Sequence, residues 1–263
     1  MTHLSDLFID TRKENRAALI GYLPAGFPTQ EMSIKIIKEM IDGGVDAIEI
    51  GFPYSDPVMD GPIIQEAAET ARAAGITMKK TLEVVREIAK TGAPTLMMTY
   101  WNPIDRYGVK RYAEDFHAAG MEGVITPDLT IEEASEWVLL TDRLDMHPIF
   151  VVAPSTGDER LKAVAEKCSG FIYAASSMGV TGARTSVSTA AKTLVDRLRR
   201  ITDTPICVGL GVSNGDQAAE VARYADGVIV GSAFVKGVLA NPNDPLPAVR
   251  AIAEDLARGV RAR

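Results

Sequence analysis

The sequence has few of the residues that mark specialised classes of protein. Aromatic residues make up only 6% of its 263 positions, and its two cysteines, Cys168 and Cys207, stand far apart without a CxxC partner. This usage argues against a disulfide framework, a zinc ribbon or a redox pair, so we expect both thiols to be small buried hydrophobic groups. There are only three histidines, and none stands where we expect catalysis or metal binding. We therefore expect no metal site.

An excess of positive charge and long hydrophobic runs are also missing. The 28 Lys and Arg residues are outnumbered by 35 Asp and Glu, which gives a formal net charge of −7. This balance argues against binding to a nucleic-acid backbone or an anionic membrane. No run approaches the roughly 20 apolar residues of a transmembrane helix, and the polar residues 1–6 do not resemble a signal peptide. We expect a cytoplasmic protein.

Short apolar runs do occur, and they alternate regularly with segments of helical periodicity. An amphipathic stretch around Leu4, Leu7 and Phe8 precedes the first run, and segments such as 31–41, 132–144 and 216–224 carry apolar residues at helical spacing. The eight runs are residues 18–23, 46–52, 94–100, 123–128, 147–154, 170–176, 205–212 and 226–233. Eight strands alternating with helices, without a break in composition, predict one α/β domain over residues 1–263. Its predicted fold is a single (β/α)8 barrel with an extra N-terminal helix.

The main alternative is an open, doubly wound parallel sheet. Such a fold uses fewer strands and reads a cofactor near its first turn. Here the turn after the first run, residues 23–29, lacks the G-x-G-x-x-G spacing. We therefore favour the closed barrel.

The run at 46–52 places a carboxyl group inside the predicted barrel. Strand alternation puts Ile48, Ile50 and Phe52 on one face, towards the helices, and Glu49 on the other. Burial raises the pKa of a carboxyl group, so Glu49 is a candidate general acid. The eight acidic residues between Lys38 and Arg72 have no basic residue among them. The alternative, a structural Glu paired with a buried cation, needs a partner from elsewhere in the chain.

Further polar groups gather where the predicted strands end. Asp56 and Asp60 follow in a loop rich in Pro and Gly, although either alone is more often a solvated loop acid. Glycine-rich segments occur at 179–182, 209–215 and 231–233, after the last three runs. Barrels often bind phosphate there with backbone N–H groups. The alternative is that these are tight turns in which Ser213 or Asn214 caps a helix.

Aromatic and apolar side chains are also expected at the strand ends. They are Tyr22, Tyr100, Trp101, Tyr173 and Leu210. Each alone is more often a core residue, but together they suit a flat apolar substrate group with a phosphate at its far end.

Several blocks of this sequence resemble the tryptophan synthase alpha chain family. The most specific is Glu-Ile-Gly-Phe-Pro-Tyr-Ser-Asp-Pro at 49–57, continued by Asp-Gly-Pro-Ile-Ile-Gln at 60–65. Supporting blocks are Tyr100 with Asn102 and Pro103, residues 127–129, and the three glycine-rich segments. The resemblance covers essentially the full length.

The resemblance implies a lyase that cleaves indole-3-glycerol phosphate to indole and glyceraldehyde 3-phosphate by a retro-aldol reaction. It implies no cofactor in this chain. It also implies an alpha-beta-beta-alpha tetramer with a beta chain that carries pyridoxal phosphate and receives indole through a tunnel. A Schiff-base aldolase would need a lysine in the barrel mouth, and no apolar run contains one.

The resemblance also implies roles for individual residues. Glu49 is the acid and base that protonates indole C3 and assists the glycerol hydroxyl. Asp60 stabilises positive charge at the indole nitrogen, and Tyr173 is an active-site tyrosine. The remaining implied substrate contacts are Tyr22, Tyr100, Ile125, Leu129 and Val151 around the indole, Gly182, Gly211, Gly231 and Ser232 at the phosphate, and Thr181 and Leu210. Asp56 and Thr181 correspond to loop residues that link lid closure to the beta chain.

Four positions depart from the family pattern. Trp101 stands where a tyrosine is common, Thr126 and Thr130 flank residues 127–129 where apolar residues or Pro are frequent, and Leu210 replaces a larger aromatic residue seen in some relatives. We expect them to affect the pocket wall or the partner face. Two other functions stay open: a metal-dependent isomerase or aldolase with Asp56 and Asp60 as ligands, and a non-catalytic subunit that binds a phosphate ligand and regulates a partner.

Overall fold

The computed structural model describes residues 3–175, 189–209 and 211–262, which contain nine strands and twelve helices. The strands are β1 (Ala18–Pro24), β2 (Ala47–Gly51), β3 (Thr95–Met98), β4 (Gly123–Ile125), β5 (His147–Ile149), β6 (Val151–Val152), β7 (Ile172–Ala175), β8 (Ile206–Gly209) and β9 (Gly227–Val230). The helices are α1 (His3–Lys13), α2 (Gln30–Asp42), α3 (Pro62–Ala73), α4 (Met78–Ala89), α5 (Trp101–Tyr107), α6 (Val109–Ala118), α7 (Ser135–Arg143), α8 (Asp158–Lys167), α9 (Thr189–Arg199), α10 (Gly215–Ala222), α11 (Ser232–Ala240) and α12 (Leu246–Arg261).

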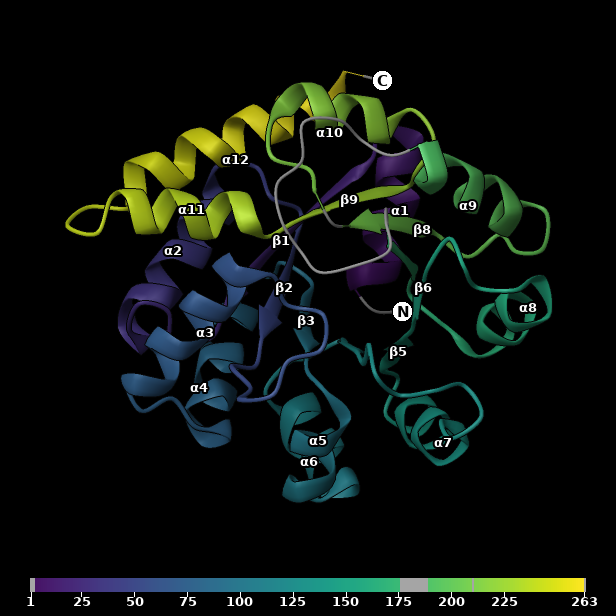
Figure 1. Cartoon of the computed structure of the whole chain (residues 1–263), viewed down its shortest axis with the longest axis horizontal. Helices are drawn as coiled ribbons and strands as arrows, with labels where there is room; N and C mark the ends of the chain where they lie inside the picture. Colours follow the sequence, from purple (N-terminus) through teal and green to yellow (C-terminus); the bar gives the residue numbers. More distant parts are fainter. Residues whose placement is uncertain (1–2, 176–188, 210, 263) are drawn as a thin grey trace.

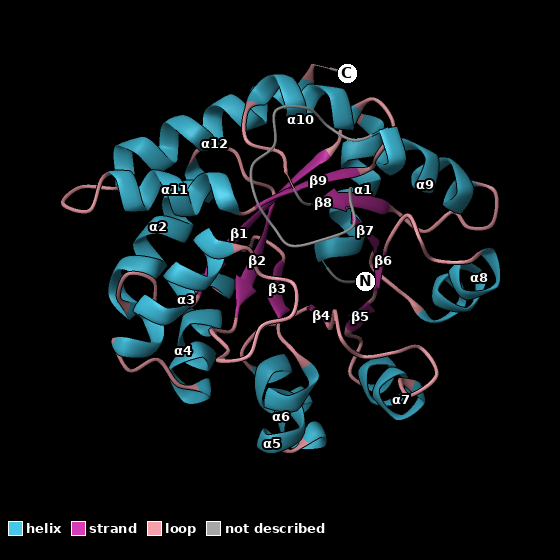
Figure 2. Ribbon diagram, viewed as in Figure 1, coloured by secondary structure: helices cyan, strands magenta, loops and turns pink. Residues whose placement is uncertain are grey.

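The strands form one parallel sheet that curves into a barrel surrounded by helices (Figures 1 and 2). The strand order is β5-β4-β3-β2-β1-β9-β8-β7-β6. Its two end strands come from the single predicted run 147–154: β5 pairs with β4, and β6 pairs with β7. The fifth strand thus joins both ends of the sheet, and the prediction of a (β/α)8 barrel is confirmed.

Each barrel strand separates two layers of the core. On β2, Ile48 and Ile50 belong to a large hydrophobic cluster shared with the surrounding helices, and Phe52 packs against that cluster. Ala47 belongs instead to a smaller cluster inside the barrel. Because side chains alternate across a strand, Glu49 also points inward, as the sequence predicts.

The extra N-terminal helix closes one end of the barrel. Leu4 and Phe8 of α1 are buried in the inner cluster, and the Phe8 ring lies 6.0 Å from the Phe171 ring in an edge-on contact. The Leu4 backbone N–H donates to the Glu122 carboxylate at 2.8 Å, which fixes the start of the helix. Since α1 fills the barrel at the N-terminal end of the strands, the C-terminal end is the one open to a ligand.

Local expectations are confirmed in part. Both cysteines are buried and free. The helix predicted over 132–144 begins only at Ser135, because residues 131–134 form a turn in which the Thr130 hydroxyl donates to the Glu133 carboxylate at 3.0 Å. A side chain that bonds locally in this way competes with the first helical turn.

Two fully buried threonines on helices give a matched test of stability. The Thr141 hydroxyl donates to the Trp137 carbonyl oxygen at 3.0 Å, whereas the Thr81 hydroxyl has no partner among the residues that the structure describes. We expect Thr81→Val to stabilise the protein by about 1 kcal/mol, since valine removes an unsatisfied polar group without changing the side-chain shape. Thr141→Val should have no such benefit. Thermal melting should show Tm about 2–4 °C higher for Thr81→Val, and equal losses in both variants would contradict this expectation.

Candidate active site

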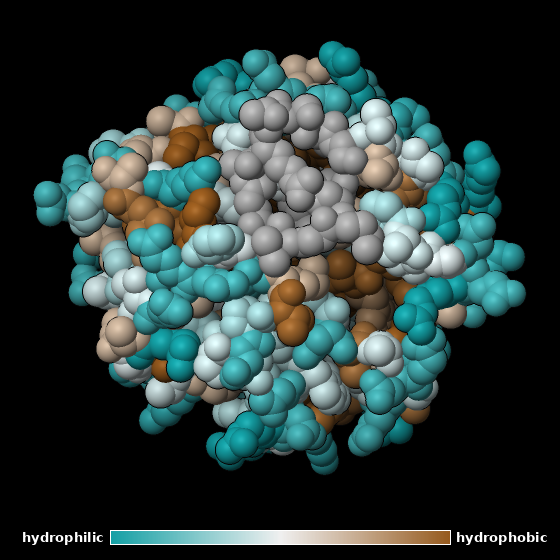
Figure 3. All heavy atoms as spheres, viewed as in Figure 1, coloured by the Kyte–Doolittle hydropathy of each residue, from teal (hydrophilic) through white to brown (hydrophobic). Residues whose placement is uncertain are grey.

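A cavity lies at the C-terminal end of the barrel strands, the end at which barrels of this kind bind their ligands. Its lining consists of Tyr22, Glu49, Asp60, Ile64, Met98, Tyr173, Gly211, Val212, Ile229, Gly231 and Ser232. In the space-filling view of this face, hydrophobic side chains gather near the centre, where β3 to β5 end, and the rim is largely hydrophilic (Figure 3). The cavity therefore combines apolar walls with a few polar groups.

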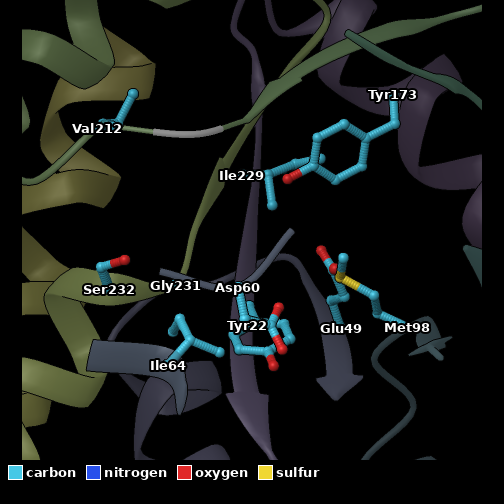
Figure 4. Close-up of a pocket in the computed structure, with 11 residues that line it drawn as sticks. Tyr22, Glu49, Asp60, Ile64, Met98, Tyr173, Val212, Ile229, Gly231 and Ser232 are labelled. Atoms are coloured by element: carbon cyan, nitrogen blue, oxygen red, sulfur yellow. The ribbon is translucent and has the colours of Figure 1, made fainter. Parts of the chain in front are cut away.

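The predicted residues enter this cavity from different strands. Glu49 and Met98 lie on one side, Tyr173 and Ile229 enter from another, and Ser232 lies at the end away from Met98 (Figure 4). Seven of the residues proposed from the sequence thus share one space: Tyr22, Glu49, Asp60, Tyr173, Gly211, Gly231 and Ser232.

Glu49 is buried in the cavity wall. It is only 1% exposed, and within the described part of the chain its Oε2 atom has no hydrogen-bond partner. Burial, followed by the charge of Asp60, raises the pKa of Glu49 to about 8. Within residues 3–175, 189–209 and 211–262, Glu49 forms no ion pair, which speaks against a salt-bridged structural role. The carboxyl group is therefore protonated at neutral pH and able to donate its proton.

Asp60 is the second carboxyl group of the cavity and lies just before helix α3. It is 9% exposed, and burial raises its pKa to about 6, although a hydrogen bond from Tyr100 opposes this shift. The Tyr100 hydroxyl also accepts from the Met59 backbone N–H at 3.1 Å, and Gln65 Nε2 donates to the Asp60 carbonyl oxygen at 2.7 Å. These contacts hold the loop so that Asp60, unlike an ordinary loop acid, faces the cavity.

Two tyrosines fit into space that glycines on neighbouring strands leave open. A Cβ atom at Gly51 would overlap the Tyr22 hydroxyl, and one at Gly209 would overlap the Tyr173 hydroxyl. Burial raises the pKa of both tyrosines well above the usual value; the nearby carboxyl groups raise it further. Both phenols therefore keep their protons at neutral pH and can donate hydrogen bonds.

An anion-binding end is formed by the segments after β8 and β9. Gly211 has φ of +103°, a conformation that favours glycine, and it opens the loop towards the cavity. Ser232 begins helix α11, and no side chain of the described residues caps its N-terminus, so its first backbone N–H groups can bind an anion. In the loop after β8, the Asn214 side chain caps α10. The helix-capping role expected as the alternative for this segment is therefore also present.

Three proposed contacts, Thr181, Gly182 and Leu210, lie outside the described residues, as does the glycine-rich segment 179–182. Others are described but do not line the cavity. Ile125 and Val151 pack in the inner cluster, Leu129 packs in the outer cluster, and Asp56 is exposed with the Ser55 hydroxyl donating to it. Among the family departures, Trp101 packs edge-on against Trp137 with ring centroids 5.6 Å apart, Thr126 is buried and Thr130 is exposed.

The sequence did not single out four lining residues, Ile64, Met98, Val212 and Ile229, although Val212 lies within the predicted phosphate segment 209–215. Alternation could have found two of them, because Met98 shares a strand face with the inner Leu96, and Ile229 belongs to the inner cluster itself. Ile64 stands on α3, and no strand periodicity indicates that this helix turns a side chain into the cavity.

The described part of the chain contains neither a metal-binding cluster nor a membrane-spanning helix. No group of three or more His, Cys, Asp or Glu side chains there could hold a metal ion. None of the helices in that part is long and apolar enough to cross a membrane.

Comparison with known proteins assigns the family. The model of the family described as "Tryptophan synthase alpha chain" matches residues 8–260. The chain belongs to this family. A tryptophan synthase alpha chain from Thermobifida fusca is 54% identical over 267 residues, with 100% of this chain and 99% of the relative covered.

Solved structures agree with the family assignment. A structure of Mycobacterium tuberculosis tryptophan synthase superposes with a TM-score of 0.94 at 48% identity, covering 99% of this chain and 98% of that chain. A tryptophan synthase subunit alpha from Legionella pneumophila gives 0.89 at 29% identity, with coverage of 99% and 98%. As a tryptophan synthase alpha chain, the protein is a carbon-carbon lyase that cleaves indole-3-glycerol phosphate to indole for a beta subunit.

Proposed function

We propose that this cavity is where indole-3-glycerol phosphate is cleaved and that Glu49 and Asp60 divide the chemistry between them. The observation that carries the proposal is the pair of buried carboxyl groups, whose pKa values burial raises to about 8 and about 6. At neutral pH the first is an acid and the second an anion. Two carboxyl groups held in different protonation states can serve different catalytic roles.

In the proposed reaction, Glu49 donates one proton and later accepts another. The protonated carboxyl group delivers its proton to indole C3, which makes the ring a leaving group and places positive charge on the indole nitrogen. The Asp60 carboxylate stabilises that charge. Glu49, now ionised, accepts the proton of the hydroxyl on the adjacent glycerol carbon as the carbon-carbon bond breaks. Indole and glyceraldehyde 3-phosphate form, and Glu49 is protonated again.

The remaining cavity residues suit the rest of this substrate. The apolar side chains Ile64, Met98 and Ile229 suit the flat indole ring, while the Tyr173 hydroxyl is available to the polar chain. Backbone N–H groups at Gly211 and the start of α11 suit the phosphate. Thr181, Gly182, Leu210, Ile125, Leu129 and Val151 stay predictions as substrate contacts, and we propose that Tyr100 acts through its hydrogen bond to Asp60.

We further propose that residues 1–263 act as one cytoplasmic domain in an alpha-beta-beta-alpha tetramer. The partner beta chain would carry pyridoxal phosphate, whereas the alpha chain itself needs no cofactor. Similarity to structures of tryptophan synthase supports the partnership. The exposed position of Asp56, in the loop that leads to Asp60, supports its proposed role in linking loop closure to the beta chain. For Thr181 the same role stays a prediction.

The direct test is an indole-release assay with indole-3-glycerol phosphate, with and without a beta chain. We expect indole in both cases and faster release with the partner, since closure of loops around a site can exclude water. Activity that EDTA abolishes and a divalent cation restores would favour the metal-dependent alternative. Tight binding of the substrate without any indole would favour the non-catalytic alternative.

The two pKa values predict a bell-shaped dependence of kcat/KM on pH. Activity requires Asp60 ionised, so it should fall as pH drops below about 6, where burial has placed the pKa of Asp60. Activity also requires Glu49 protonated, so it should fall as pH rises above about 8. Steady-state indole release from pH 5 to 9 measures both limbs, and a flat profile over this range would contradict the assignment.

Ser232→Asp tests the phosphate end. A carboxylate at the first position of α11 would place like charge beside the phosphate, so we expect KM to rise at least about tenfold with a smaller change in kcat. Ser135→Asp is the matched control, because Ser135 is the exposed first residue of α7 and does not line the cavity. Equal KM values for the two variants would show that the phosphate lies elsewhere.

A further inference from the structure

The cavity loop after β8 is tied to the helix that follows it by a buried glutamine. Gln217 lies in the first turn of α10 and is 9% exposed. Its side-chain Oε1 atom accepts two hydrogen bonds from one residue: from the Ser213 backbone N–H at 2.8 Å and from the Ser213 hydroxyl at 3.0 Å. A buried polar side chain that accepts two hydrogen bonds from one loop residue fixes the position of that residue.

Two further contacts hold the same segment. The Asn214 side-chain Oδ1 atom accepts from the Gln217 backbone N–H at 3.0 Å, which caps α10. From helix α12, the Asp255 Oδ2 atom accepts from the Gly215 backbone N–H at 2.7 Å. The loop is thus attached at three successive residues, Ser213, Asn214 and Gly215.

These attachments bear on the cavity because Gly211 and Val212, the residues just before them, line it. Gly211 has φ of +103°, in the region that favours glycine, and glycine has more conformational freedom to lose than any other residue. Gly211 has no side chain that could hold its backbone in place, so neighbouring residues have to do so. The N–H and hydroxyl of Ser213 point towards Gln217, which leaves the earlier loop residues to face a ligand.

We propose that Gln217 is a positioning residue for the phosphate end of the cavity. It touches no substrate atom; it holds Ser213 so that the backbone of Gly211 and Val212 presents a preformed surface to the phosphate. Preformed sites bind more tightly because less ordering has to accompany binding. The inference rests on the proposed function, since it assumes that the phosphate of indole-3-glycerol phosphate lies beside this loop.

The test separates the phosphate end from the indole end on the full-length protein. Gln217→Met removes the acceptor at similar length, and Gln217→Asn keeps the amide but shortens its reach by one carbon. Calorimetry then measures binding of glycerol 3-phosphate, which has the phosphate without the reactive aldehyde, and of indole, which has no phosphate. We expect both variants to bind glycerol 3-phosphate about tenfold more weakly and indole within about twofold of wild type, because only the phosphate end loses its support.

Kinetics and a matched control complete the test. We expect KM for indole-3-glycerol phosphate to rise about tenfold while kcat falls less than about threefold. Gln30→Met is the control, since Gln30 begins α2 and donates to the Glu83 carboxylate at 2.9 Å away from the cavity lining; it should leave both affinities unchanged.

Each remaining outcome overturns one specific claim. If folded Gln217 variants bind glycerol 3-phosphate like wild type, or lose indole and phosphate binding equally, Gln217 is not a positioning residue for the phosphate. If wild-type protein binds indole but not glycerol 3-phosphate, the proposed phosphate end itself fails, whatever the variants do. Gln217→Asn keeps the test decisive should the methionine variant not fold.

Discussion

Replacing Glu49 with glutamine is expected to reduce indole release by about 10²–10⁴-fold, the usual contribution of a general acid or base. The amide has nearly the same shape but cannot deliver a proton to indole C3. Because burial raises the pKa of Glu49 to about 8, the native side chain is already uncharged at neutral pH. Glutamine therefore introduces no change of charge, and we expect the fold and substrate binding to persist. Calorimetry with indole-3-glycerol phosphate should give a dissociation constant close to that of wild type.

Glu122→Gln is the control for this substitution. Glu122 is also largely buried, but it accepts from the Leu4 backbone N–H at the opposite end of the barrel. We expect turnover within about twofold of wild type there, because the residue is remote from the cavity. If Glu49→Gln kept more than about a tenth of wild-type turnover, Glu49 would not be the proton donor.

The barrel and the inward position of Glu49 could be predicted because both depend on periodicity. Apolar runs alternate with helical segments along the whole chain, and within β2 a period of two assigns Ile48 and Ile50 to the outer face. The same reasoning cannot show that the run 147–154 divides into β5 and β6. That division follows from the two neighbours, β4 and β7, which the strand must reach to close the barrel.

Periodicity alone could not place Asp60, Leu129 or Gln217. Asp60 lies in a loop, and only the contacts with Tyr100 and Gln65 show that it faces the cavity. Leu129 shows the opposite case, because a residue just after a strand packs among the helices. Gln217 lies within α10, but its burial and its hydrogen bonds with Ser213 give no signal in the sequence, and Asp255 of α12, some forty residues later, holds the neighbouring Gly215. Tertiary packing decides all three positions.

Asp60→Asn is expected to lower turnover by about 10²–10³-fold, since it removes the negative charge that stabilises the indole nitrogen in the transition state. The asparagine side-chain oxygen can still accept from Tyr100, so the loop should stay in place. The variant should also alter the pH profile in two ways. The acid limb near pH 6 should disappear with the group that causes it. The alkaline limb should move below pH 8, because the charge of Asp60 contributes to the raised pKa of Glu49.

The pH profile distinguishes loss of charge from general damage to the protein. Asp115→Asn is a matched control, because Asp115 accepts a hydrogen bond from the Tyr107 hydroxyl at 2.7 Å on helix α6, where neither residue lines the cavity. It should leave both turnover and the two limbs unchanged. An Asp60→Asn variant that loses turnover but keeps the alkaline limb at pH 8 would mean that Asp60 does not act on Glu49. Unchanged turnover would remove Asp60 from the catalytic step. The shift of the limb therefore tests the coupling between the two carboxyl groups, and the loss of rate tests the role of the charge.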